Sequence, residues 1–288
     1  MKKNNLIILF CSISLLFAQN SQAQNEDKTY KLNWKVDAPL TAAAIGGTAL
    51  GFSLISQQDG IDSLTLANLD KNDVNSFDRS VAGNFDLDAE VQSDALFFGA
   101  FPYGLILLAD KKARKEAGTI GLLYLQTVSL SSMSYSLAAG NTNRYRPYTY
   151  IQDQKDNEEL QGDRRSLNAR NSFWGGHPAT VAASTVFVAK VYNDLHPESN
   201  LKYVFWGVAG ASSIATAALR VKAGKHFYTD VITGVAVSSA IGYFVPHLHK
   251  VKKEETSFNI MPYTGETTGL FMTYTFRKKD RKIINFEL

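Results

Sequence analysis

Residues 203–246 decide the fold: two apolar segments, YVFWGVAGASSIATAAL (203–219) and VITGVAVSSAIGYFVP (231–246), flank the charged link RVKAGKHFYTD (220–230). Both apolar segments are rich in Ala, Gly, Ser and Thr, and neither alternates apolar with polar residues. We therefore expect helices over 203–219 and 229–246. Small residues at this density let helix backbones approach closely, as they do in membrane proteins. The stretch predicts two closely packed helices joined by a polar link.

Four more apolar segments of the same character precede this pair, and they cover residues 39–55, 94–109, 117–140 and 179–193. Together the six segments predict an all-α, six-helix bundle over residues 39–250. Each segment is near the lower limit of about 20 residues that a membrane-spanning helix needs, and the mean hydropathy of the chain is a modest −0.14. We expect a bundle embedded in or associated with a membrane, and the alternative is an exported helical domain.

Composition excludes several classes of protein. The 288 residues are 45% apolar, and 30 basic residues nearly balance 27 acidic ones, so the chain is neither disordered nor a polyelectrolyte. The formal net charge of +3 gives no reason to expect nucleic-acid binding. The single cysteine, Cys11, excludes a disulfide scaffold and a multi-cysteine metal site.

The two ends of the chain carry their own signals. Residues 1–23 combine Lys2 and Lys3, an apolar run, and the small-x-small sequence Ser21-Gln22-Ala23, which is typical of a cleaved signal peptide. We therefore expect export to a bacterial cell envelope, with a polar lead-in over 24–38 and the site facing the periplasm. An uncleaved N-terminal anchor is the alternative reading.

The C-terminal segment 256–288 has a different residue pattern from the long apolar segments before it. A period-two pattern runs over 270–276, where Leu270, Met272, Tyr274 and Phe276 alternate with Phe271, Thr273 and Thr275. It predicts a short β-hairpin with a partner strand over 258–263 and a turn over 264–269, followed by a charged tail.

Three short charged segments lie at ends of the predicted helices. They are RYRP (144–147) after the third helix, GGH (175–177) before the fourth, and RVKAGKHFYTD (220–230) between the fifth and the sixth. In an up-down bundle these three connections share one end. The pattern therefore predicts that two histidines, one carboxylate, several arginines and a glycine-rich helix start gather there.

This set of groups suits phosphoryl transfer. His226 and Asp230 are four residues apart, so on a helix they would share a face, and the carboxylate could fix the imidazole tautomer. The other ring nitrogen would then be free to act as a nucleophile. Arginine offers a planar fork that matches phosphate, and backbone N–H groups at a helix start favour an anion. The inventory indicates transfer through a phosphohistidine.

The segments resemble the motifs of the type 2 phosphatidic acid phosphatase (PAP2) superfamily, which run Lys-x6-Arg-Pro, Pro-Ser-Gly-His and Ser-Arg-x5-His-x3-Asp. The third motif reads Leu219-Arg220-x5-His226-x3-Asp230 here and lacks only its leading Ser. The second reads Trp174-Gly175-Gly176-His177, so Pro and Ser are replaced. The first keeps Arg146-Pro147, but its Lys falls on Ala139.

The resemblance implies a role for each of these residues. His226 would attack phosphorus, and Asp230 would orient it. His177 would protonate the leaving oxygen and then activate water. The phosphate would be held by Arg146, Arg220 and the backbone N–H groups of Gly175 and Gly176, with Arg144 or Lys225 replacing the missing lysine. The resemblance implies no metal and no cofactor.

The expected function is therefore a metal-independent phosphatase that acts on a phosphorylated lipid in the bacterial envelope. Three alternatives remain: an exported acid phosphatase for soluble phosphomonoesters, a vanadate-binding haloperoxidase of the same superfamily, and a degenerate phosphate-binding or structural protein. The polar link over 153–170 is expected to be either a solvated loop or a mobile flap over the phosphate, with Arg164 and Arg165 attracting the anionic head group.

Overall fold

The computed structural model describes residues 28–153, 157–251, 257–264 and 268–275. The signal peptide predicted over 1–23 and the charged tail after 276 lie outside the described residues. The chain divides into a helical unit that ends at Lys250 and a C-terminal unit that begins at Val251.

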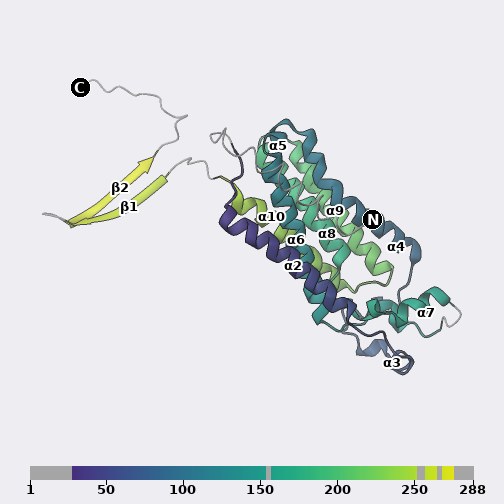
Figure 1. Ribbon diagram of the computed structural model, residues 1–288. Helices are drawn as coiled ribbons and strands as arrows, with labels where there is room; N and C mark the ends of the chain where they lie inside the picture. The colour runs from purple at the N-terminus through teal and green to yellow at the C-terminus, as the bar shows by residue number, and fades with distance from the viewer. Residues whose placement is uncertain (1–27, 154–156, 252–256, 265–267, 276–288) are drawn as a thin grey trace, which may run out of the picture. The chain divides into compact units, whose positions relative to one another are not determined.

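Six long helices build the described part of the helical unit and run alongside one another (Figure 1). They are α2 (Trp34–Ser56), α4 (Leu87–Tyr103), α6 (Ala117–Asn141), α8 (Gly176–Leu195), α9 (Leu201–Lys222) and α10 (Tyr228–His249). Each contains or overlaps one of the six apolar segments, and α4 continues as a 3-10 helix over Gly104–Ala109. The all-α bundle is confirmed, although α2 begins at Trp34, inside the segment expected to be a polar lead-in.

Helix α8 forms the centre of the bundle, because nearly every one of its residues is buried and α4, α6, α9 and α10 all pack against it. Small residues bring α10 close to it. A Cβ atom added at Gly234 would lie 2.7 Å from the carbonyl oxygen of Gly175, and one at Gly242 would lie 2.7 Å from that of Ala183. The two helices therefore meet backbone to backbone, as the small-residue content predicts.

Four helical segments of the described residues are long and apolar enough to cross a membrane: Trp34–Ser56, Leu87–Ala109, Leu201–Lys222 and Tyr228–His249. Their most apolar windows are at most one-third buried inside the protein. Large apolar side chains are exposed along them, including Phe52, Phe98, Ile214 and Phe244. The described chain therefore has four candidate membrane-spanning helices, which pack around the buried α8 and the partly buried α6.

Shorter elements cover the two ends of the bundle. Helices α3 (Ser63–Asn68) and α7 (Glu158–Arg165) lie at one end, and α5 (Lys111–Lys115) lies at the other (Figure 1). The α3 end also holds the 3-10 helices Lys71–Asp73, Arg79–Val81, Pro147–Tyr150 and Leu167–Arg170.

The link between the first two motifs differs from the expected loop or flap. It is largely helical, since it contains α7 and the 3-10 helix Leu167–Arg170. Arg164 is buried and donates from Nε and Nη2 to the carbonyl oxygen of Thr149, at 3.2 and 3.0 Å. The guanidinium of Arg164 therefore stabilises the backbone of its own region, and the expectation that it attracts a head group was wrong.

At the α5 end a buried polar cluster holds the start of the described chain. Tyr30 donates its hydroxyl to Asp194 Oδ2 at 2.9 Å and its backbone N–H to Glu116 Oε2 at 3.0 Å. Asp194 also pairs with Lys250 Nζ at 2.7 Å and with Lys190. The cluster ties α6, α8 and the end of α10 to the N-terminal segment.

The C-terminal unit has two strands, β1 (Ser257–Thr264) and β2 (Thr268–Thr275). They pair antiparallel, with Ser257 opposite Thr275 and Thr264 opposite Thr268.

Candidate functional site

The three charged segments meet at the α3 end of the bundle, where backbone hydrogen bonds join them directly. The N–H of Tyr148 donates to the carbonyl of Gly224 at 3.1 Å, and that of Gly175 donates to the carbonyl of Asp230, also at 3.1 Å. These bonds link the chain after α6 to the α9–α10 connection, and the first turn of α10 to the start of α8. The prediction that the segments share one end is confirmed.

His226 is buried in the link between α9 and α10 and precedes the helix that begins at Tyr228. Its Nδ1 lies 2.7 Å from the carbonyl oxygen of Ser172. A carbonyl can only accept, so Nδ1 carries the hydrogen and the neutral ring has its lone pair on Nε2. Burial, followed by the positive charges of Arg146 and Arg220, lowers the pKa of His226 well below its ordinary value. The ring is therefore neutral and has one basic nitrogen.

Asp230 does not contact His226 as the sequence suggested. Its carboxylate accepts from Ser172 Oγ at 2.6 Å and from the backbone N–H of Phe227 at 2.8 Å, and it pairs with Arg144. The expected spacing argument was wrong because residue 226 lies outside the helix. Ser172 bridges the two residues, since its hydroxyl donates to Asp230 and its carbonyl accepts from His226.

His177 occupies the first turn of α8, which is not among the candidate spans. Its Nε2 lies 2.9 Å from Asp94 Oδ1, and its ring stacks on Phe97 with centroids 4.2 Å apart. Burial, followed by the charges of Arg220, Arg146 and Lys225, lowers the pKa of His177. Both histidines therefore belong to one cationic cluster.

Arg146 and Arg220 are buried, and among the described residues each has a buried Nε donor without an acceptor. Arg146 Nη2 donates to Asn171 Oδ1 at 2.8 Å, and Arg220 Nη1 donates to Asp94 Oδ1 at 3.1 Å and Ser93 Oγ at 3.3 Å. Within the described chain, the Nε atoms of both arginines have no acceptor. An unsatisfied buried donor costs about 1–3 kcal/mol, and more when it is charged. The pair is therefore suited to an anionic ligand that supplies the missing acceptors.

Of the two expected replacements for the missing lysine, only Lys225 lies in this cluster. Its Nζ lies 2.8 Å from Glu90 Oε1 and 2.7 Å from Asp163 Oδ2. It is also close enough to contribute to the lowered pKa of His177. Ala139, where the family lysine would fall, is fully buried.

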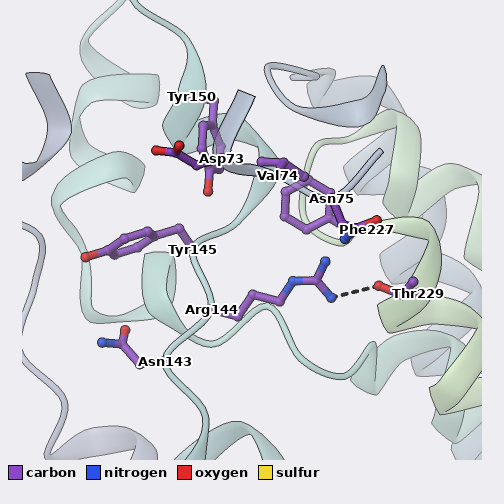
Figure 2. A pocket seen from close by; sticks show the side chains of 9 residues that line it. All are labelled: Asp73, Val74, Asn75, Asn143, Arg144, Tyr145, Tyr150, Phe227 and Thr229. Carbon is purple, nitrogen blue, oxygen red and sulfur yellow. Dashed lines mark hydrogen bonds between the residues drawn. The ribbon is translucent and has the colours of Figure 1, made fainter. Parts of the chain in front are cut away.

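Arg144 is engaged elsewhere. Its guanidinium pairs with Asp78 at 2.7 Å and with Asp230, and it lies 4.6 Å over the ring of Phe227. It also donates to Thr229 Oγ1 at 2.8 Å, the bond drawn as a dashed line in Figure 2. Figure 2 shows it lining a separate pocket of about 440 Å³. Two carboxylates already neutralise Arg144, so it does not replace the lysine.

The two glycines before His177 serve the packing of the helix start. The N–H of Gly175 already donates to the carbonyl of Asp230, so it is not available to a phosphate as expected. A Cβ atom at Gly176 would lie 2.7 Å from the ring of Tyr135. Gly176 therefore lets α6 approach the first turn of α8.

Sequence reasoning missed the acidic residues that complete the cluster. Glu90 and Asp94 of α4 pair with Lys225 and with the Arg220–His177 pair, respectively. The available signal was their spacing: two carboxylates four apart at the polar start of an apolar helix share one face. No sequence pattern pointed to Ser172, because it contacts His226 through its backbone carbonyl, a group that every residue has.

Comparison with known proteins agrees with this description. Residues 120–254 match the family model described as PAP2 superfamily. No curated protein matches the chain. One similar solved structure is the transmembrane PAP2 type phosphatidylglycerolphosphate phosphatase from Bacillus subtilis, which covers 85% of this chain and 94% of its own, with 16% identity and a TM-score of 0.35. The matched residues 120–254 hold both histidines and both buried arginines, so the part of the chain that carries the site is similar to the PAP2 superfamily.

Proposed function

We propose that this protein is a phosphatase that hydrolyses a phosphorylated lipid through a phosphohistidine on His226. The observation that carries the proposal is a buried neutral imidazole with a basic Nε2, set among Arg146 and Arg220, whose Nε groups have no acceptor in the described chain. Oriented donors in a water-poor site stabilise the charge that develops on a transferring phosphoryl group.

In the first step His226 acts as the nucleophile. The lone pair on Nε2 forms a bond to phosphorus, while the bond between phosphorus and the leaving oxygen breaks. The electron pair of that bond stays on the leaving oxygen. The negative charge of the bound phosphate counters the effect of burial and of the neighbouring cations, which lower the pKa of His177, so the ring enters this step protonated and donates its proton to that oxygen. The two arginines hold the non-bridging oxygens throughout.

In the second step water releases the phosphate. His177, now neutral, takes a proton from water as the water oxygen bonds to phosphorus. The N–P bond breaks, and its electron pair returns to Nε2 of His226. The enzyme is then restored, with inorganic phosphate as the second product.

A lipid substrate fits the position of the site. His177 stacks on Phe97 of α4, a candidate membrane-spanning helix. The neighbouring Phe98 is 66% exposed and lies edge to face against Phe97. The leaving group would therefore depart beside an apolar surface. We place the site on the periplasmic side, an orientation that rests on the signal peptide predicted over 1–23.

The test uses the purified full chain in detergent with two substrates, a short-chain phosphatidic acid and p-nitrophenyl phosphate. We expect wild type to hydrolyse the lipid and to form an acid-labile phosphoenzyme. His226→Asn should lose turnover by more than about 1,000-fold, because a covalent step has no substitute nucleophile.

His247→Asn is the matched control, because His247 is an exposed histidine near the other end of α10, and it should keep wild-type turnover. Acid-labile label that persists on His226→Asn would refute the mechanism. Hydrolysis of p-nitrophenyl phosphate alone would favour a phosphatase for soluble esters. Phosphate binding without turnover of either substrate would favour the non-catalytic alternative.

A further inference from the structure

Asp94 lies at the centre of the cluster, although it comes from α4 and lies outside the matched residues 120–254. Its Oδ1 is 2.9 Å from His177 Nε2 and 3.1 Å from Arg220 Nη1. One carboxylate oxygen therefore joins the residue proposed as the acid to an arginine proposed to hold phosphate. None of the three family motifs supplies this carboxylate.

The charges around His177 explain why a carboxylate is needed there. Burial and then three cations lower the pKa of His177, and a proton on the imidazole would add a fourth positive charge to the cluster. Glu90 is directed to Lys225, which it shares with Asp163. Among the described residues, Asp94 is the carboxylate that pairs with His177. The titratable and charged side chains of this cluster are Glu90 and Asp94 of α4, Tyr135 of α6, Asp163 of α7, Arg220 of α9, and Arg146, Lys225 and His226 of the connecting segments.

We infer that Asp94 is a positioning residue that orients His177 and lets it hold the proton it gives to the leaving group. This inference rests on the proposed function. A carboxylate that accepts from one imidazole nitrogen fixes the tautomer and stabilises the imidazolium form.

The pairing also assigns the two ring nitrogens. Nε2 is the ring nitrogen that lies 2.9 Å from Asp94 Oδ1, so the inference assigns to Nδ1 the exchange of protons with the substrate. In the first step the proton on Nδ1 passes to the leaving oxygen, which keeps the electron pair of the broken P–O bond. In the second step Nδ1 takes a proton from water, and the carboxylate stabilises the resulting imidazolium. The stack on Phe97 holds the plane of the ring.

The test compares leaving groups in Asp94→Asn, which keeps the shape of the side chain and removes its charge. The ester oxygen of phosphatidic acid needs a proton to depart, whereas p-nitrophenolate leaves as a stable anion. We expect kcat/KM for phosphatidic acid to fall about 10- to 100-fold, the scale of a weakened general acid, and kcat/KM for p-nitrophenyl phosphate to change little. The alkaline limb of the pH profile should move to lower pH, because the imidazolium loses its counter-charge.

The matched control is Asp88→Asn, which removes an exposed carboxylate from the first turn of the same helix and should leave both substrates and the pH profile unchanged. Binding of inorganic phosphate to Asp94→Asn shows that the site still folds. This measurement separates loss of the acid from loss of structure.

Three results with Asp94→Asn would overturn the inference. An equal fall for both substrates, with an unchanged pH profile, assigns Asp94 to structure alone. Tighter phosphate binding with no loss of turnover means that Asp94 occupies the place of a phosphate oxygen. Wild-type behaviour of Asp94→Asn, in an enzyme that still forms the phosphoenzyme, removes Asp94 from the reaction but leaves the proposed function intact. If wild type hydrolyses neither substrate, the proposed function fails and the inference fails with it.

Discussion

A backbone carbonyl sets the tautomer of His226. The carbonyl of Ser172 accepts a hydrogen bond from Nδ1 at 2.7 Å. The carboxylate of Asp230 accepts from the Ser172 hydroxyl and does not contact the ring of His226. A carboxylate in direct contact would stabilise the imidazolium, whereas a neutral carbonyl fixes the tautomer with less bias toward the charged form. The residue-level arrangement therefore favours a neutral ring with a basic Nε2.

Stability should depend on pH through the buried His226 and the partly buried His177. Burial and neighbouring cations lower the pKa of His226 and of His177 in the folded protein, while in the unfolded chain each titrates near its ordinary pKa of about 6.5. Below that pH the unfolded chain binds more protons, so stability is fully present above it and is lost as pH falls.

We expect the thermal midpoint in detergent to fall as the pH drops from 7.5 to 5. The fall should be smaller in His226→Gln, which removes one of the two titrating groups. A midpoint that does not change with pH, or an identical slope in the variant, would contradict this explanation.

At the scale of elements, the contact between α8 and α10 depends on glycine. A Cβ atom at Gly242 would lie 2.7 Å from the carbonyl oxygen of Ala183 and 3.2 Å from Val186 Cβ. These are backbone and branched side-chain atoms, which cannot move aside cheaply. The α8–α10 packing positions the site, because His177 begins one helix and His226 precedes the other.

Gly242→Ala should therefore destabilise the protein by about 1–3 kcal/mol, the usual cost of overpacking. Gly207→Ala in α9 is the control, because a Cβ atom there meets nothing within 4 Å. It should be neutral or stabilise by about 0.5–1 kcal/mol through helix propensity. Unfolding in detergent with an added denaturant measures both, and equal effects would show that the α8–α10 contact is less tight than described.

At the scale of the whole molecule, the helical unit has an unusual distribution of apolar surface. Four candidate spans carry exposed large apolar side chains, while the interior helices α6 and α8 carry buried Ser and Thr, such as Ser131, Ser136 and Ser184. A water-soluble bundle shows the reverse pattern, because exposed apolar patches promote association. The molecule is therefore built to expose the outer faces of these helices to lipid.

We expect the full chain to sediment with membranes and to remain there after an alkaline carbonate wash, because four apolar helices do not leave lipid under conditions that remove peripheral proteins. Release should require detergent. Release by carbonate alone would contradict membrane insertion and would favour the exported helical domain.

The sequence by itself determined the helices and the end of the bundle at which the chemistry gathers. Long runs rich in small apolar residues have no strand-like pattern, so all six helices were predictable. His177, Arg146, Arg220 and His226 lie at helix ends, and their shared location follows from the alternating direction of successive helices.

Only the tertiary structure decided which side chains meet. The long helices are apolar around most of their circumference, so no periodic pattern shows which face of α4 turns toward α8 and α9. The rotation of α4 places Asp94 on His177 and Arg220, which follow it by 83 and 126 positions. The start of α10 at Tyr228 likewise leaves His226 in the preceding link, where it meets the Ser172 carbonyl and not Asp230. Contacts of this kind depend on helix rotation and on the exact residue at which a helix begins, and both are set by packing across the whole bundle.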